Sequence, residues 1–158
     1  MENMEIEKKY LIDKDMLPPD YKSHAFHKIE QGYLNTRPVV RIRKQDDNYY
    51  LTYKGNGLMA REEYNLPLDA DSYNHLLPKC DGNIISKTRY NIPFNNYKIE
   101  LDIFEGEYKG LVLAEVEFAT EEDAISYAPP EWFGEDVSER AEFCNSYLSA
   151  HCCRDITF

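Results

Sequence analysis

Ionisable residues recur at alternate positions in seven short segments of this chain. The first segment is Glu5-Ile6-Glu7-Lys8-Lys9, and the others are Arg41-Ile42-Arg43, Thr52-Tyr53-Lys54, Arg61-Glu62-Glu63, Lys87-Thr88-Arg89, Glu100-Leu101-Asp102 and Glu115-Val116-Glu117. In a β-strand, residues two positions apart share a face. Each segment therefore predicts a strand that places its charges on one side, and that common side carries both signs.

The chemistry that these side chains support is the binding of a metal ion together with a polyphosphate. The common face gathers the carboxylates Glu5, Glu7, Glu63, Glu100, Asp102, Glu115 and Glu117 with the bases Lys9, Arg41, Arg43, Lys54, Arg61, Lys87 and Arg89. Carboxylates supply the oxygen ligands that Mg²⁺ prefers, and Arg and Lys bind phosphate oxygens. In any single segment, a solvated strand face with cross-strand ion pairs would give the same pattern.

The elements that must position these residues are mostly strands. Period-2 patterning predicts strands over residues 4–12, 26–36, 38–45, 48–55, 59–67, 84–92, 96–104 and 110–118. Asp46-Asp47-Asn48 and Gly55-Asn56-Gly57 are typical turn sequences between them. Eight strands joined mostly by short turns predict a mainly β (α+β) fold, an antiparallel meander closed into a barrel.

Three helices are expected beside the strands. Asp69 is the expected cap of a helix that runs to about Leu77 and stops at Pro78. Thr120 begins a sequence that resembles a capping box, which predicts a short helix after it. Ser138 is the expected cap of a C-terminal helix near residues 139–150.

Length and composition limit the possible classes of protein. The 158 residues predict a single domain over 1–158, and the net charge of −11 disfavours nucleic-acid binding, which requires a basic face. The apolar runs are too short for a membrane span, and the acidic N-terminus lacks the apolar region of a signal peptide. A cytoplasmic location follows as the default expectation.

Taken in order, the motifs resemble those of the CYTH family, also called triphosphate tunnel metalloenzymes. The resemblance begins at Glu5-x-Glu7-x-Lys9 and continues through Gln31-Gly32-Tyr33-Leu34, Arg41-Ile42-Arg43, Leu51-Thr52-Tyr53-Lys54, Arg61-Glu62-Glu63-Tyr64, Lys87-Thr88-Arg89-Tyr90, Glu100-Leu101-Asp102-Ile103-Phe104 and Ala114-Glu115-Val116-Glu117-Phe118. It covers nearly the whole chain. The tail Pro129-Pro130-Glu131-Trp132-Phe133-Gly134 is similar to that of the short bacterial branch.

This resemblance implies an eight-stranded antiparallel barrel that forms a charged tunnel, with flanking helices and a C-terminal helix. It implies an inorganic triphosphatase, dependent on Mg²⁺ or Mn²⁺, that cleaves a terminal phosphoanhydride bond by water attack. The implied catalytic residues are Glu5, Glu7, Glu115 and Glu117; the implied metal ligands are Glu5, Glu7, Glu63, Asp102, Glu115 and Glu117; and the implied substrate-binding residues are Lys9, Arg41, Arg43, Lys54, Arg61, Lys87 and Arg89.

One segment departs from the family pattern, and other functions stay open. Where relatives have basic residues early in the C-terminal helix, this chain has Ala141, Glu142 and Cys144. The departure leaves substrate preference and closure of the tunnel undecided. The alternatives are a class IV adenylate cyclase, a thiamine triphosphatase, and a non-catalytic module that binds polyphosphate or nucleotide. The expected partner is inorganic triphosphate or another small molecule with a triphosphate group, and a homodimer is a further expectation.

Overall fold

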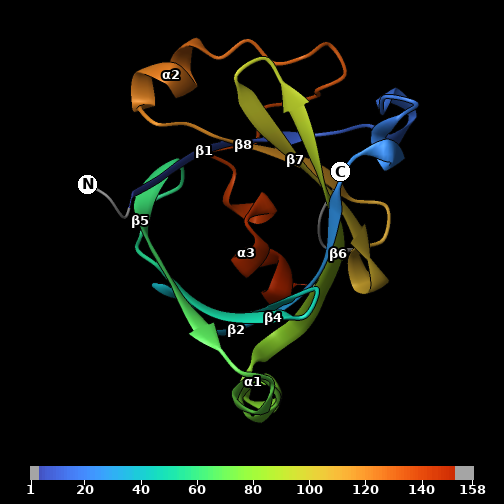
Figure 1. Cartoon of the computed structure of the whole chain (residues 1–158). Coiled ribbons are helices and arrows are strands. Elements are labelled where there is room, and N and C mark those ends of the chain that lie inside the picture. Colours follow the sequence, from blue (N-terminus) through green and yellow to red (C-terminus); the bar gives the residue numbers. More distant parts are fainter. Residues whose placement is uncertain (1–3, 152–158) are drawn as a thin grey trace.

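Eight antiparallel strands close into a barrel in the computed structural model, which describes residues 4–151 (Figure 1). The strands are β1 (Met4–Leu11), β2 (Phe26–Thr36), β3 (Val39–Gln45), β4 (Asn48–Lys54), β5 (Ala60–Leu68), β6 (Asp81–Phe94), β7 (Tyr97–Glu105) and β8 (Val112–Glu117). All eight predicted strands form, and the main difference in bounds is that β6 begins at Asp81 instead of residue 84. The mainly β class and the closed barrel are confirmed.

The order of strands around the barrel is more complex than the predicted meander. The order is β1-β5-β4-β3-β2-β6-β7-β8, and every neighbouring pair is antiparallel. Strand β1 closes the barrel because Met4–Ile6 pair with β5 and Glu7–Leu11 pair with β8. The first strand thereby brings its acidic residues beside side chains from the middle and the end of the chain.

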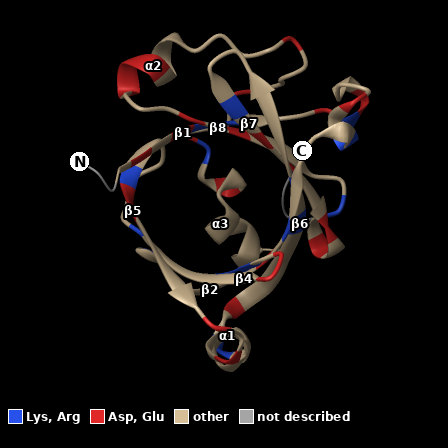
Figure 2. Ribbon diagram, viewed as in Figure 1, with Lys and Arg blue, Asp and Glu red and all other residues tan. Residues whose placement is uncertain are grey.

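The largest apolar core lies outside the barrel wall. Tyr10, Leu101 and Val116 alternate with inward charges, so they face outward and are buried under the segments that cover the barrel. Phe133 packs on Tyr10 with ring centroids 4.7 Å apart. Because the apolar core lies outside the wall, polar residues can occupy much of its interior, and Figure 2 shows basic and acidic positions along the ring of strands.

One end of the barrel interior is apolar and is filled by the C-terminal part of the described chain. Ile85, Phe104 and Leu113 from three strands pack against Phe143 and Leu148. Figure 1 shows α3 (Asn145–Ala150) within the ring of strands. Burying large apolar side chains contributes about 1.5–3 kcal/mol each, so this packing holds α3 in place and closes that end.

Two of the three predicted helix caps are present. The Asp69 carboxylate accepts a hydrogen bond from the Ser72 backbone N–H at 2.7 Å and begins α1 (Ala70–Leu76). The Thr120 hydroxyl accepts one from the Asp123 N–H at 3.1 Å and begins α2 (Glu121–Ser126). After α1, the chain continues into the 3₁₀ helix η3 (Leu77–Lys79), which contains Pro78.

A C-terminal helix forms, but its predicted start at residue 139 and its predicted Ser138 cap are wrong. The chain forms the 3₁₀ helix η5 (Ala141–Phe143), passes through extended backbone at Cys144, and then forms α3. The Ser138 hydroxyl instead accepts a hydrogen bond from the Lys9 backbone N–H at 2.9 Å. A hydrogen bond with β1 thus replaces the local cap. The sequence pattern of the C-terminal segment could not reveal this contact with a distant strand.

The remaining 3₁₀ helices lie in connections between strands. They are η1 (Lys14–Met16), η2 (Tyr21–Ser23) and η4 (Gly106–Tyr108). Within residues 4–151, every helix is too short or too polar to cross a membrane.

Candidate active site

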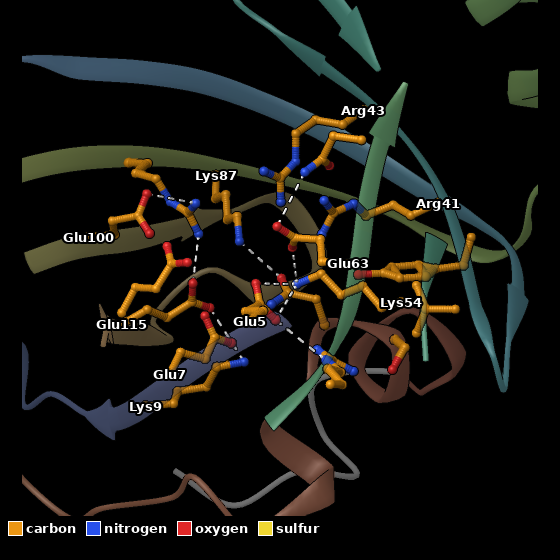
Figure 3. Close-up of a pocket in the computed structure, with 18 residues that line it drawn as sticks. Glu5, Glu7, Lys9, Arg41, Arg43, Lys54, Glu63, Lys87, Glu100 and Glu115 are labelled. Atoms are coloured by element: carbon orange, nitrogen blue, oxygen red, sulfur yellow. Dashed lines mark hydrogen bonds and ion pairs between the residues drawn. The ribbon is translucent and has the colours of Figure 1, made fainter. Parts of the chain in front are cut away.

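The charged faces of the strands surround a cavity of about 180 Å³ inside the barrel (Figure 3). With the exception of Asp102, every residue predicted for the site lines this cavity: Glu5, Glu7, Lys9, Arg41, Arg43, Lys54, Arg61, Glu63, Lys87, Arg89, Glu115 and Glu117. They come from β1, β3, β4, β5, β6 and β8. The alternation read from sequence therefore converges on one cavity.

On one side of the cavity, Lys54 joins two carboxylates. Its Nζ lies 2.9 Å from a Glu5 oxygen and 3.1 Å from a Glu63 oxygen, and Arg61 Nε lies 3.5 Å from Glu5. Burial alone would raise the pKa of Glu5, but the charges of Lys54 and Arg61 and its hydrogen bonds outweigh burial and lower that pKa to about 2. Glu5 is therefore a carboxylate at neutral pH.

Asp102 is fully buried in a cluster of ion pairs and does not line the cavity. It accepts from Arg89 Nε at 2.7 Å and from Arg89 Nη2 at 2.8 Å, and Lys87 Nζ lies 2.7 Å away. Burial would raise the pKa of Asp102, but Arg89 and Lys87 outweigh burial and lower it. These contacts occupy both carboxylate oxygens, so the geometry favours a structural role over the predicted role as a metal ligand.

Beside Glu5, where β1 pairs with β8, acidic side chains are crowded together. Glu7 and Glu117 are directly opposite across β1 and β8, and Glu115 pairs with Glu100 across β8 and β7. Burial, followed by the charges of Glu115 and Glu5, raises the pKa of Glu7 to about 8. Burial and three other carboxylates also raise the pKa of Glu117. Like charges held this close favour a cation between them.

Glu115 differs from its acidic neighbours because bases flank it. Lys9 Nζ lies 3.4 Å and Arg89 Nη2 lies 3.0 Å from its oxygens. Burial would raise the pKa of Glu115, but Lys9 and Arg89 outweigh burial and hold that pKa well below its usual range.

The acidic side of the cavity fits a hard cation by donor type. Glu7 and Glu117 offer carboxylate oxygens whose charged forms are disfavoured by their neighbours, and a cation would relieve that cost. Within the part of the chain that the structure describes, no three His, Cys, Asp or Glu side chains already converge as a metal cluster.

Comparison with known proteins places the chain in a family. A family model described as the CYTH domain matches residues 3–144. The chain belongs to the CYTH family. An inorganic triphosphatase of Nitrosomonas europaea is 37% identical to this CYTH protein over 149 residues, which cover 92% of this chain and 96% of that protein. An inorganic triphosphatase of Acetivibrio thermocellus is 36% identical over 149 residues, with 91% and 92% covered.

The CYTH barrel also superposes on a solved structure. The crystal structure of the inorganic triphosphatase NE1496 aligns with a TM-score of 0.69 and 33% sequence identity, over 93% of this chain and 95% of that chain. The predicted family and barrel are therefore confirmed.

Six further residues of the CYTH cavity were outside the predicted site set. They are Tyr33, Val39, Glu100, Asn65, Asn145 and Ser146. Glu100 shares a strand face with Asp102, so alternation placed it on the charged side without showing which of the two reaches the cavity. Asn145 and Ser146 belong to α3, and no strand pattern could have placed them here.

At the end of the barrel that holds α3, two lysines of the cavity donate hydrogen bonds to neutral acceptors. Lys87 Nζ donates to the Asn145 side-chain oxygen at 3.1 Å, and Lys9 Nζ donates to the Phe143 backbone carbonyl at 3.2 Å. Two of the positions that depart from the family pattern, Ala141 and Cys144, line an adjoining cavity of about 560 Å³. These two positions therefore line this second cavity and are absent from the lining of the charged cavity.

Proposed function

We propose that this CYTH protein is a metal-dependent inorganic triphosphatase. The main support is that one cavity sets crowded carboxylates on β1 and β8 against the arginines of β3 (Figure 3). A chain of linked phosphates with bound metal carries both kinds of charge and complements both sides. The relatives named inorganic triphosphatase, at 36–37% identity, support the same substrate.

The proposed roles follow the two sides of the cavity. Lys9, Arg41, Arg43, Lys54, Arg61, Lys87 and Arg89 bind the phosphate oxygens, with Arg41 and Arg43 the bases most available to substrate because carboxylates flank the others. Glu7, Glu117, Glu115, Glu5 and Glu63 hold the metal and orient the attacking water. Mg²⁺ or Mn²⁺ is the proposed ion, since both prefer oxygen ligands.

The proposed reaction is hydrolysis of a terminal phosphoanhydride bond. Water forms a bond to the terminal phosphorus while the bond from that phosphorus to the bridging oxygen breaks, which yields orthophosphate and pyrophosphate. Negative charge spreads over the phosphoryl oxygens, and the guanidinium groups of Arg41 and Arg43 stabilise it. A bound metal ion supplies charge neutralisation and lowers the pKa of a water ligand.

The test is phosphate release from tripolyphosphate, ATP and thiamine triphosphate in parallel, each with Mg²⁺, Mn²⁺ or EDTA, with cAMP assayed in the ATP samples. Metal-dependent hydrolysis of tripolyphosphate in preference to the others is the expected result. Formation of cAMP without tripolyphosphate hydrolysis would assign a cyclase, and preference for thiamine triphosphate would assign that activity. Binding of tripolyphosphate without turnover of any substrate would assign a binding module.

A matched pair of variants ties the activity to the cavity. Glu63 lines the cavity, whereas its neighbour Glu62 is exposed on the outer face of the same strand. Glu63→Gln is expected to lower turnover, and Glu62→Gln makes the same chemical change outside and is expected to leave it unchanged. Equal activity in the two variants would contradict the proposed site.

A further inference from the structure

Arg41 and Arg43 differ from the other bases of the cavity in what surrounds them. Lys9, Lys54, Arg61, Lys87 and Arg89 each form an ion pair with a carboxylate. Arg41 and Arg43 form none with the residues that the structure describes. Something other than opposite charge must therefore hold these two guanidinium groups.

Gln31 holds Arg43. The two residues are directly opposite across β2 and β3, and Arg43 Nε donates to Gln31 Oε1 at 2.8 Å. The Gln31 side chain is fully buried, and its Nε2 donates to the Tyr33 hydroxyl at 3.2 Å. A glutamine with both ends bonded in this way has one orientation, and it presents a neutral oxygen to Arg43.

Thr52 holds Arg41 in the same manner. The two are directly opposite across β3 and β4, and Arg41 Nη2 donates to Thr52 Oγ1 at 3.2 Å. The Thr52 hydroxyl, which is fully buried, donates in turn to Asn65 Oδ1 at 2.6 Å. Arg41 Nε is buried and has no hydrogen-bond partner among residues 4–151. The guanidinium of Arg41, which lines the cavity, is therefore held by a neutral hydroxyl.

Neutral partners orient an arginine without cancelling its charge. A carboxylate in place of either partner would compete directly with a phosphate oxygen for the guanidinium group. Burial, together with the nearby charges of Arg41 and Arg89, lowers the pKa of Arg43 to about 9, so the group stays cationic at neutral pH although its neighbours repel it. An incoming polyanion would relieve that repulsion.

We propose that Gln31 and Thr52 are positioning residues that hold Arg43 and Arg41 through uncharged oxygens and thereby keep both cations available to the triphosphate. The inference rests on the proposed function, because it concerns the same substrate. Neither residue need touch the substrate. Each acts through the arginine to which it is bonded.

Gln31→Glu tests the charge of the partner separately from its shape. The variant is isosteric, its carboxylate accepts from Arg43, and the Tyr33 hydroxyl can reverse to donate to it. The expected result is a rise of roughly tenfold in KM for tripolyphosphate, with a much smaller change in kcat and no loss of Tm. A KM equal to that of the wild type would overturn the role of Gln31.

Thr52→Val and Thr52→Ser test the hydroxyl separately from packing. Valine keeps the volume and loses the hydrogen bond, so its KM is expected to rise; serine keeps the hydroxyl and is expected to retain the wild-type KM. Thr88→Val is the matched control, since the buried Thr88 hydroxyl bonds Lys28 and Glu105 on the outer face. A purely structural effect would lower Tm and the active fraction, and hence apparent kcat, without moving KM.

Calorimetric binding of tripolyphosphate in EDTA separates failure of this inference from failure of the proposed function. A wild-type protein that binds tripolyphosphate in EDTA but does not hydrolyse it with Mg²⁺ or Mn²⁺ overturns the proposed function alone, and the variants are then compared by Kd. A wild-type protein that does not bind and does not turn over the substrate overturns both. Wild-type turnover with unchanged KM in both Gln31→Glu and Thr52→Val overturns only the positioning role.

Discussion

Replacing Asp102 by Asn separates a structural carboxylate from a metal ligand. Asp102 is fully buried and faces Lys87 at 2.7 Å and Arg89 at 2.7 and 2.8 Å. Arg89 keeps Glu100 and Glu115 as partners in the variant, but Lys87 keeps only the neutral side chain of Asn145. The variant thus removes the close counter-charge of a buried amine whose pKa is already lowered to about 7, chiefly by burial.

Asp102→Asn is expected to lower the free energy of unfolding by about 3 kcal/mol, which is the lower end of the range for breaking a buried ion pair. For a chain of this size that corresponds to a fall in Tm of roughly 6–12 °C. The assay is thermal unfolding of both proteins in EDTA and again with Mg²⁺. Glu100→Gln is the control, because Glu100 contacts only Arg89 at 3.2 Å and is partly exposed; its expected cost is below about 1 kcal/mol.

The loss of unfolding free energy caused by Asp102→Asn is expected to depend on pH in one direction. The folded-state pKa of Asp102 lies below the value of 3.8 for an unperturbed Asp, so the folded state binds this proton more weakly than the unfolded state. Its stabilisation is therefore fully present above that ordinary value and disappears as the pH falls through the lower folded-state pKa. The part of the difference in unfolding free energy that comes from this carboxylate should therefore shrink in acid.

The reasoning about Asp102 would be refuted by one specific result. If Asp102→Asn unfolds in EDTA within about 2 °C of the wild type and also loses stabilisation by Mg²⁺, the carboxylate is a metal ligand and not a structural partner of Lys87.

Three further variants test separate parts of the structure. Arg43→Ala should raise KM for tripolyphosphate by about 10–100-fold, measured by phosphate release, and an unchanged KM would place Arg43 outside the substrate site. Glu117→Gln should abolish metal-dependent turnover while the free energy of unfolding changes by less than about 0.5 kcal/mol, because Glu117 is an exposed residue in the wall of the cavity; wild-type rates would remove it from the site. Phe143→Ala should lower the free energy of unfolding in urea by about 3 kcal/mol or more, since Phe143 is fully buried at the end of the barrel that holds α3, and a smaller loss would show that the packing of Phe143 contributes little to stability.

Local pattern predicted the strands well and the C-terminal segment poorly. Alternation is a property of each strand alone, and Asp69 and Thr120 cap helices through contacts three residues away, so these features could be read directly. Ser138 failed as a cap because its hydroxyl bonds the backbone of Lys9 on β1. A contact between residues so distant in sequence leaves no local signal.

The site residues were predictable as a set but not as partners. Strand parity put Asp102 and Glu100 on one face, yet Asp102 is sealed between Lys87 and Arg89 while Glu100 lines the cavity. Gln31 and Thr52 carry no charge and so were not predicted as site residues, although each is bonded to an arginine of the cavity.

The sequence by itself determined that the charges of each charged strand share one face, because a period of two fixes the face of each side chain wherever the strand lies. Tertiary structure alone decided which charges neutralise one another and which stay available. The insertion of β1 between β5 and β8 sets Glu7 against Glu117, and the register of β2, β3 and β4 gives Arg43 and Arg41 neutral partners. The pairing of β1 with β8 joins strands distant in sequence, and its register is fixed only when the barrel closes. In the consecutive hairpins of β2, β3 and β4, the turns set the register, which sequence alternation within a single strand does not specify.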